Sequence, residues 1–244
     1  MKIGILKTDD VRDEWVARFG EYPDMFRRLL NAVDPSLEFA EYDVRIGEYP
    51  RDIDDVDAYL ITGSRNSVYE ELPWIHGLIE FVQGLHARRK KLLGICFGHQ
   101  IVAQALGGQA EKAVAGWGVG LHEHRFTRRP QWLDDGDLSF PVLVSHQDQV
   151  TINAAAAEVL AGSEFCPNAV CQIGDHILTM QGHPEFENDY SREIMEYRRE
   201  IIGEKVYASG MESLQGQPAS RRMAQWLLNF LRGQSTAVED EDAA

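Results

Sequence analysis

Apolar and polar positions in the first half of the chain alternate between two patterns. Short apolar runs are typical of buried strands, whereas apolar residues three or four positions apart predict amphipathic helices. Strands are predicted at Lys2–Lys7, Leu37–Val44, Ala58–Thr62 and Lys91–Ile95. Helices are predicted by apolar faces made of Met25, Phe26, Leu29, Leu30 and Val33, of Trp74, Ile75, Leu78, Ile79, Val82 and Leu85, and of Ile101, Val102, Ala105 and Leu106. This alternation predicts an α/β fold, a three-layer sandwich with a mostly parallel central sheet and helices on both faces.

The second half holds shorter strand candidates: Val119–Phe126, Phe140–Val144, Cys171–Ile173 and Ile177–Gln181. We interpret them as hairpins that extend the same sheet. Two closing helices are predicted, one from Tyr190, Ile194, Tyr197 and Ile201, the other from Met223, Trp226, Leu227, Phe230 and Leu231. No repeat or Pro/Ser-rich linker divides the chain. We therefore expect one domain over residues 1–233 and an acidic, disordered tail over residues 234–244.

Composition narrows the class of protein. The chain has 244 residues and a formal net charge of −15, which argues against a nucleic-acid partner because phosphate binding needs a concentrated basic face. No apolar stretch reaches about 18 residues, so we expect no membrane span. The N-terminus is interpreted as a strand and not as a secretory signal. With an odd number of cysteines, three, this indicates free thiols in a reducing cytoplasm.

The segment Gly94-Ile95-Cys96-Phe97-Gly98 is the first candidate for chemistry. It joins an apolar strand directly to a helix, which is the cysteine form of a nucleophile elbow. The sharp turn predicts a strained backbone at Cys96 and requires small residues at positions 94 and 98. Cys96 then lies at a helix N-terminus, which favours its thiolate. The backbone N–H of Phe97 is placed to act as an oxyanion donor.

The alternative for Cys96 is a buried structural thiol, the usual state of a free intracellular cysteine. Its position between a strand and a helix favours the nucleophile. Cys166 and Cys171 have no such setting, and no histidine pair accompanies them. We expect these two to be small buried apolar side chains and not a metal site.

A thiolate nucleophile needs a histidine whose tautomer is fixed by a partner. His183 suits this role best because it stands in His183-Pro184-Glu185, directly after a predicted strand. Proline biases the preceding residue toward extended backbone, in which side chains at i and i+2 point to the same side. Glu185 would then accept a hydrogen bond from one ring nitrogen of His183 while the other nitrogen faces Cys96.

The remaining histidines fit the role less well. His99 lies in the elbow helix and is expected to be structural, and His146 lies in a loop where it could contact substrate. His122 and His124 alternate along a predicted strand, a spacing that suits a metal ion, but the sequence offers no third ligand. We expect a solvated strand face there and no metal site.

These segments resemble the class I glutamine amidotransferases that use a Cys-His-Glu triad. Thr62–Tyr69 resembles their glycine-rich oxyanion loop, Gly94–Gln100 their elbow and Gly182–Glu185 their His-Pro-Glu motif. Ser145–Val150 is similar to the Ser-His-Gly-Asp-x-Val segment in the glutaminase domain of GMP synthetase. The motifs follow the family's order, and the resemblance implies a flavodoxin-like fold.

The resemblance implies a hydrolase that cleaves the γ-amide of glutamine or of another γ-glutamyl compound. Cys96 would form a γ-glutamyl thioester, His183 would transfer protons and Glu185 would orient the imidazole. The implied oxyanion donors are the backbone N–H groups of Gly63 and Phe97. The positions implied to bind the α-amino and α-carboxylate groups of the substrate are Gln100, Ser145, His146 and Gln147. The family implies no metal and no organic cofactor for this half-reaction.

Three features depart from the glutaminase subunits of the family. The oxyanion loop reads Gly63-Ser64-Arg65 where Gly-Gly-Pro is common, Gln147 replaces the glycine of Ser-His-Gly-Asp, and Phe19–Pro23 adds an N-terminal segment. Together with Gly116–Gly120, these features resemble the stand-alone γ-glutamyl peptidases of the same superfamily.

Three functions stay open on the sequence. The first is a hydrolase of glutamine or of γ-glutamyl amides and peptides. The second is a glutaminase subunit that passes ammonia to a separate synthase of the GMP synthetase type, since the chain contains no synthase domain of its own. The third is a non-catalytic binding protein on the same fold, and the intact Cys96, His183 and Glu185 set weighs against it.

Overall fold

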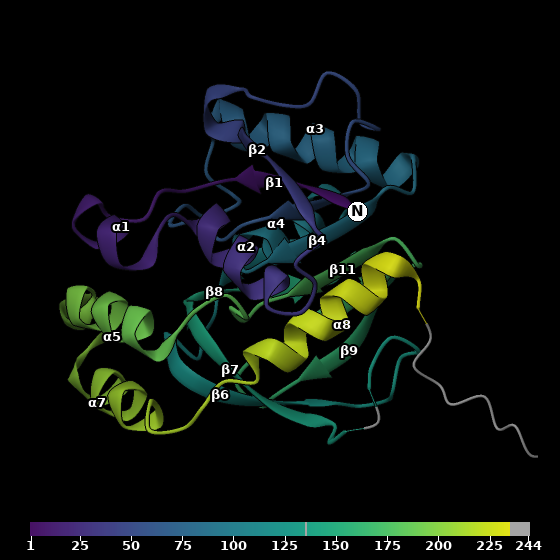
Figure 1. The fold of residues 1–244 in the computed structure, drawn as a ribbon. Coiled ribbons are helices and arrows are strands. Elements are labelled where there is room, and N and C mark those ends of the chain that lie inside the picture. Colours follow the sequence, from purple (N-terminus) through teal and green to yellow (C-terminus); the bar gives the residue numbers. More distant parts are fainter. Residues whose placement is uncertain (135, 235–244) are drawn as a thin grey trace, which may run out of the picture.

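A nine-stranded sheet forms the centre of the computed structural model, which describes residues 1–134 and 136–234 (Figure 1). The strand order is β2-β1-β3-β4-β11-β10-β9-β6-β7. The parallel part comprises β2 (Glu38–Asp43), β1 (Lys2–Lys7), β3 (Ala58–Ile61), β4 (Lys91–Ile95) and β11 (Ile177–Met180). The antiparallel part comprises β10 (Val170–Ile173), β9 (Ala157–Gly162), β6 (Gly118–Phe126) and β7 (Ser139–His146). The predicted fold class and the hairpin extension of the sheet are therefore confirmed.

Helices cover both faces of the parallel strands because successive side chains of a strand point to opposite sides. Ile3 and Ile5 of β1 pack with one pair of helices, and Leu6 of β1 and Ile61 of β3 pack with the other pair. The first pair is α2 (Tyr22–Asn31) and α8 (Ser220–Arg232), and the second is α3 (Pro73–Ala87) and α4 (Phe97–Ala105) (Figure 1). Each such fully buried aliphatic side chain contributes about 1.5–3 kcal/mol, which fixes the strand ends that hold the site.

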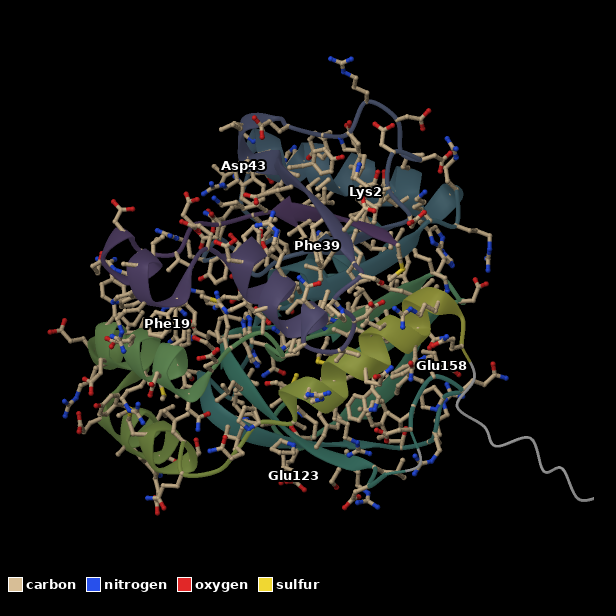
Figure 2. All side chains as sticks on the ribbon, viewed as in Figure 1. Lys2, Phe19, Phe39, Asp43, Glu123 and Glu158 are labelled. Carbon is tan, nitrogen blue, oxygen red and sulfur yellow. The ribbon has the colours of Figure 1, made fainter. Side chains whose placement is uncertain are left out.

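A third group of helices gathers at one end of the molecule, and the two later ones of the group lie beside β6 and β7 (Figure 1). It consists of α1 (Asp13–Phe19), α5 (Asn188–Tyr197) and α7 (Glu204–Ser213). Phe19, at the end of α1, lies close to α5 in Figure 2, and its ring centroid is 5.1 Å from that of Tyr190. The N-terminal segment Phe19–Pro23 thus packs on the helix that follows His183-Pro184-Glu185.

The helices after β11 differ from the prediction of a single helix through Tyr190 and Ile201. Helix α5 ends at Tyr197, and a single turn, α6 (Arg199–Ile202), follows. Arg198 separates them, with φ −96° and ψ 5°. Helix α7 was not predicted because few of its apolar side chains face the core: Tyr207 and Gly210 are its buried residues.

Further short elements also lack a clear apolar pattern and were not predicted. They are α1, the 3-10 turn Val44–Ile46, strand β9 and a separate two-stranded sheet of β5 (Gln109–Lys112) and β8 (Asp148–Ile152). The acidic tail predicted over residues 234–244 lies, apart from Gln234, outside the described residues. Among the described helices, none has the length and apolar character that crossing a membrane requires.

Candidate active site

Cys96 lies at the junction of β4 and α4 with the strained backbone that its glycine-flanked motif predicts. Its φ is 53° and its ψ is −100°. Such a conformation costs a non-glycine residue about 1–3 kcal/mol. A Cβ atom on Gly94 would lie 2.5 Å from the carbonyl oxygen of Gly98, and one on Gly98 would lie 2.6 Å from that of Ile61. No side chain fits at either position, so both glycines are a steric requirement of the turn.

His183 and Glu185 approach each other as predicted, but the extended backbone predicted for this segment is wrong beyond His183: Pro184 and Glu185 form a turn, in which the N–H of Phe186 donates to the carbonyl oxygen of His183 at 3.5 Å. The Nδ1 atom of His183 is 2.7 Å from Oε1 of Glu185, and both side chains are at most 5% exposed. A Cβ atom on Gly63 would lie 2.9 Å from Cε1 of His183 and 3.7 Å from Cβ of Cys96. The structure therefore brings Cys96, His183, Glu185 and Gly63 together from three separate segments, which follow β4, β11 and β3.

The charge state of His183 follows from its neighbours. Burial disfavours the imidazolium, but the carboxylate of Glu185 and the hydrogen-bonded sulfur of Cys96 outweigh it and raise the pKa of His183 to about 10. Because Nδ1 is hydrogen-bonded to Glu185, the other ring nitrogen, Nε2, is the one that forms the hydrogen bond to the sulfur of Cys96. A cationic imidazole beside a cysteine is the environment in which a thiolate is stabilised.

Packing also holds the imidazole of His183. The ring of Phe186 stacks on it, with centroids 3.9 Å apart and planes 8° from parallel. The backbone N–H of His183 donates to the carbonyl oxygen of Leu143 in β7 at 2.8 Å. Phe186 was not predicted as a site residue, although an aromatic residue three positions after the histidine was visible in the sequence.

The two predicted oxyanion donors differ in how they are oriented. Phe97 is the first residue of α4, so its N–H has no acceptor within the helix. Oγ1 of Thr8 donates to the carbonyl oxygen of Gly63 at 2.8 Å, and the carbonyl oxygen of Thr62 faces the same hydroxyl at 3.2 Å. In a trans peptide the N–H points opposite to the C=O. Because the carbonyl of Thr62 faces Thr8, the N–H of Gly63 in the same peptide points away from Thr8. Thr8 lies far from the motifs in sequence and was missed.

Cys96 opens into a pocket of about 450 Å³ that all four predicted substrate-binding residues line: Gln100, Ser145, His146 and Gln147. The amide nitrogen of Gln100 donates to the carbonyl oxygen of Asp148 at 2.9 Å and to Oε1 of Gln181 at 3.1 Å. Its own carbonyl oxygen is thus the group left for a ligand. Gln181, also not predicted, donates to the sulfur of Cys96 at 3.5 Å and fixes its position.

The other three predicted binding residues have distinct surroundings. The Nδ1 of His146 lies 3.1 Å from the carbonyl oxygen of Asp148, and burial, with the charge of His183, lowers the pKa of His146 to about 3. The hydroxyl of Ser145 accepts from Nη1 of Arg198 at 3.0 Å. The carbonyl of Gln147 accepts from the backbone N–H of Ala113 at 2.9 Å. His146 is therefore neutral. The hydrogen bond of Gln147 holds the loop over residues 113–117 against the pocket.

Charged residues of the pocket to which the sequence analysis assigned no role include Asp9, Arg65 and Asp148. Asp9 and Arg65 form an ion pair at 2.8 Å. The carboxylate of Asp148 accepts a hydrogen bond from Oγ of Ser67 at 2.6 Å and has no ion-pair partner among the described residues. An acidic group in this state suits a cationic amino group of a ligand.

Predictions for the residues outside the site have mixed outcomes. His99 is structural: it is buried, its Nδ1 lies 2.8 Å from Oγ1 of Thr179, and burial lowers its pKa to about 4. Cys166 and Cys171 are buried as predicted. The solvated face predicted at His124 is wrong, because this side chain is 2% exposed and packs beside Phe140 inside the sheet.

A metal site finds no support in the part of the chain that the structure describes, where no three His, Cys, Asp or Glu side chains cluster to hold an ion.

Comparisons with known proteins identify the family of this chain. Residues 22–197 match the family model of glutamine amidotransferase class-I. The chain is 30% identical to gamma-glutamyl peptidase 2 of Arabidopsis thaliana over 226 residues, which cover 89% of this chain and 90% of the relative. It is 32% identical to gamma-glutamyl peptidase 3 of the same organism over 198 residues, which cover 77% and 80%.

The fold has close counterparts among solved structures. A glutamine amidotransferase from Thermotoga maritima matches it with a TM-score of 0.71 over 94% of this chain and 96% of that chain, at 19% identity. From the family match and the two relatives, the chain belongs to the class-I glutamine amidotransferase family.

Proposed function

We propose that this protein hydrolyses the γ-amide bond of a γ-glutamyl compound through a thioester on Cys96. The observation that carries the proposal is the strained Cys96 at the floor of a pocket, beside a buried imidazole paired with Glu185. Strained backbone and shifted pKa values gather at catalytic sites because they serve the reaction and not the fold. The names of the two peptidase relatives support a γ-glutamyl peptide or amide as the substrate.

In the first half of the reaction the sulfur of Cys96 attacks the γ-carbonyl carbon and a C–S bond forms. Negative charge develops on the carbonyl oxygen, and the N–H groups of Gly63 and Phe97 stabilise it. The imidazolium of His183 gives its proton to the amide nitrogen. The C–N bond then breaks, and the free amine leaves.

In the second half the neutral imidazole of His183 takes a proton from water as the water oxygen attacks the thioester carbon. The tetrahedral species collapses and the C–S bond breaks. Glutamate leaves, and the thiolate and imidazolium are restored. Glu185 stabilises the cationic imidazole in both halves and keeps its proton-carrying nitrogen toward the reacting atoms.

The floor of the pocket offers groups for both charged substituents on the α-carbon of a γ-glutamyl moiety. The carbonyl oxygen of Gln100 and the carboxylate of Asp148 are acceptors for the α-ammonium group. The segment from Ser145 to Gln147 is placed for the α-carboxylate, in agreement with the family motif it resembles.

The test measures glutamate release by the purified full-length chain from glutamine and from a series of γ-glutamyl dipeptides. We expect turnover without any added protein, and a loss of at least about 10³-fold in Cys96→Ala. Cys166→Ala, which changes a buried thiol outside the pocket, is the matched control and should stay active. Hydroxylamine should intercept the thioester of the wild-type chain as γ-glutamyl hydroxamate.

Glutamate release that survives in Cys96→Ala would refute the proposal. So would a wild-type chain idle on every substrate; turnover that then began on addition of an ammonia-accepting synthase would favour the glutaminase subunit instead.

A further inference from the structure

The pocket that contains Cys96 extends well beyond the groups used in the mechanism above. Its volume, about 450 Å³, falls within the range of about 300–1,000 Å³ typical of sites for drug-sized molecules. The outer part lies between α1, the loop over residues 113–117 and the break between α5 and α6. We call this part the outer subsite; its lining includes Trp15, Trp117, Tyr197, Arg198 and Ile201.

The outer subsite presents apolar surface to solvent. Tyr197 is 59% exposed and Ile201 is 65% exposed. The ring of Trp15 meets Tyr197 edge to face with centroids 5.9 Å apart, and the guanidinium of Arg12 lies 3.9 Å from the centroid of Tyr197. These contacts hold the aromatic wall in place before any ligand arrives. Exposed apolar side chains grouped at a pocket mouth mark a binding surface.

Arg198 supplies a positive charge to the same subsite. Its Nη1 donates to the hydroxyl of Ser145, and its guanidinium lies 5.6 Å from the centroid of Trp117. No carboxylate among the described residues pairs with Arg198, whereas Arg12 and Arg65 of the same pocket are paired with acidic residues. The guanidinium keeps donors for a planar anion such as a carboxylate.

Lys112 lines the pocket as well and has no ion-pair partner among the described residues. Its side chain is exposed, so a carboxylate contact there would contribute little. Arg198 is half-buried against Trp117 and Ser145, where water competes less for the anion. Arg198 is therefore the better anion site.

The chemistry of the leaving group decides what this arrangement recognises. Glutamine releases ammonia, which is too small to contact Trp15, Trp117 or Arg198. A γ-glutamyl dipeptide releases an α-amino acid, whose carboxylate lies two bonds from the nitrogen that His183 protonates. That amino acid brings a carboxylate and a side chain into the outer part of the pocket together.

We propose that the outer subsite binds the leaving amino acid of a γ-glutamyl dipeptide. Arg198 binds its carboxylate, and the wall of Trp15, Trp117 and Tyr197 contacts its apolar or aromatic side chain. The inference rests on the proposed function and narrows its substrate class to γ-glutamyl dipeptides with an apolar leaving residue and a free carboxylate.

The experiment compares kcat/KM for four substrates: γ-glutamyl-phenylalanine, its carboxamide, γ-glutamyl-glycine and glutamine. In the wild type, γ-glutamyl-phenylalanine should exceed its carboxamide by about tenfold or more, because the amide lacks the charge that Arg198 binds. In Arg198→Met, which keeps an apolar stem, the ratio of acid to amide should fall to about one, chiefly through KM. Arg198→Lys should recover part of that ratio. In Trp117→Ala the preference for phenylalanine over glycine should fall by about fivefold or more.

Arg192→Met is the matched control: this arginine lies on α5, is paired with Asp189 and does not line the pocket. Its substrate ratios should equal those of the wild type. A wild type that cleaves the acid and the carboxamide equally well would overturn the inference while leaving the proposed function intact, and this comparison needs no variant to fold. An unchanged acid-to-amide ratio in an active Arg198→Met would do the same. A wild type that cleaves none of the four substrates would overturn both.

Discussion

The floor of the pocket, around Cys96 and His183, and the outer subsite, around Trp117 and Arg198, differ in how the chain builds them. Cys96, His183 and Glu185 are at most 6% exposed and are held by tight backbone geometry. The outer subsite is half-buried or exposed, and its side chains come from three segments outside the sheet. The outer subsite can therefore change its side chains, and with them the preferred substrate, while the residues around Cys96 stay the same. Surface segments tolerate substitutions that a tightly packed floor does not.

This contrast has a kinetic meaning. A variant of the floor should slow every substrate by a similar factor, because in the proposed mechanism each substrate passes through the same thioester. A variant of the outer subsite should change the ratio between substrates. The following predictions test the residues of the floor. In each kinetic prediction, a changed ratio of kcat/KM for γ-glutamyl-phenylalanine to kcat/KM for glutamine would contradict this contrast.

The largest expected effect is in thiol reactivity. Iodoacetamide near neutral pH should alkylate Cys96 at least about 10³-fold faster than Cys166 or Cys171. Cys96 lines the pocket, whereas burial raises the pKa of both other thiols to about 12. Peptide mapping by mass spectrometry gives the three rates. Labelling of all three at similar rates would show that the floor does not activate its sulfur.

Glu185→Gln should lower kcat/KM by about 10²–10³-fold for all substrates. The substitution keeps the shape and removes the charge that raises the pKa of His183. The pKa of His183 should therefore fall, and the alkaline decline in rate should move to lower pH. Glu187→Gln, an exposed carboxylate two positions away, should leave the pH profile unchanged.

The same pair predicts how stability depends on pH. His183 has a raised pKa in the folded chain, so its pairing with Glu185 stabilises the fold fully below the ordinary histidine pKa of about 6.5. That contribution should be lost as the pH rises toward about 10. Urea unfolding of the wild type and of Glu185→Gln across this range should show the difference between them shrinking. A constant difference would contradict the pairing.

Gly98→Ala should lower kcat/KM by about 10–10²-fold and the free energy of unfolding by about 1–3 kcal/mol. The new Cβ would lie 2.6 Å from a backbone oxygen that cannot move aside cheaply. Gly84→Ala in α3, where a Cβ meets no heavy atom within 4 Å, is the control and should stabilise the chain by about 0.5–1 kcal/mol. Kinetics and urea unfolding measure both, and normal activity in Gly98→Ala would show that the elbow is looser than its contacts indicate.

The smallest expected effect is in Phe186→Leu, with kcat lower by about three- to tenfold and KM little changed. Leucine removes the flat ring that stacks on His183 and leaves Glu185 in place. The imidazole should then visit more orientations, which lowers the fraction of time in productive geometry. A loss as large as that of Glu185→Gln would mean that Phe186 does more than orient the imidazole.

The sequence located the floor because local backbone rules determine it. The glycines around Cys96 allow the strained turn that the structure has. The two-residue spacing of His183 and Glu185 keeps their side chains within reach, although Pro184 lies in a turn and not in the extended backbone that was predicted. Thr8 and Gln181 could not be found in this way. Their roles arise from contacts with Thr62 and Cys96 across neighbouring strands.

The outer subsite escaped sequence reasoning for a different reason. Tyr190, Ile194, Tyr197 and Ile201 have the spacing of one buried helix face, yet Tyr197 and Ile201 are exposed. Spacing reports that side chains share a face but not what that face meets. Helix α5 ends before Arg198, and the last two residues of this spacing, Tyr197 and Ile201, therefore line the pocket.

The imidazole of His183 lies against the ring of Phe186, and the space beside its Cε1 has no room for a Cβ on residue 63. The base is consequently confined like a core side chain and cannot swing to follow its substrate. Proton transfer from a fixed imidazole has one direction. The amide nitrogen of the substrate must therefore be positioned in that direction by the residues that bind the rest of the substrate. Under the proposed function, selectivity then depends on how the substrate is aligned as well as on how tightly it binds.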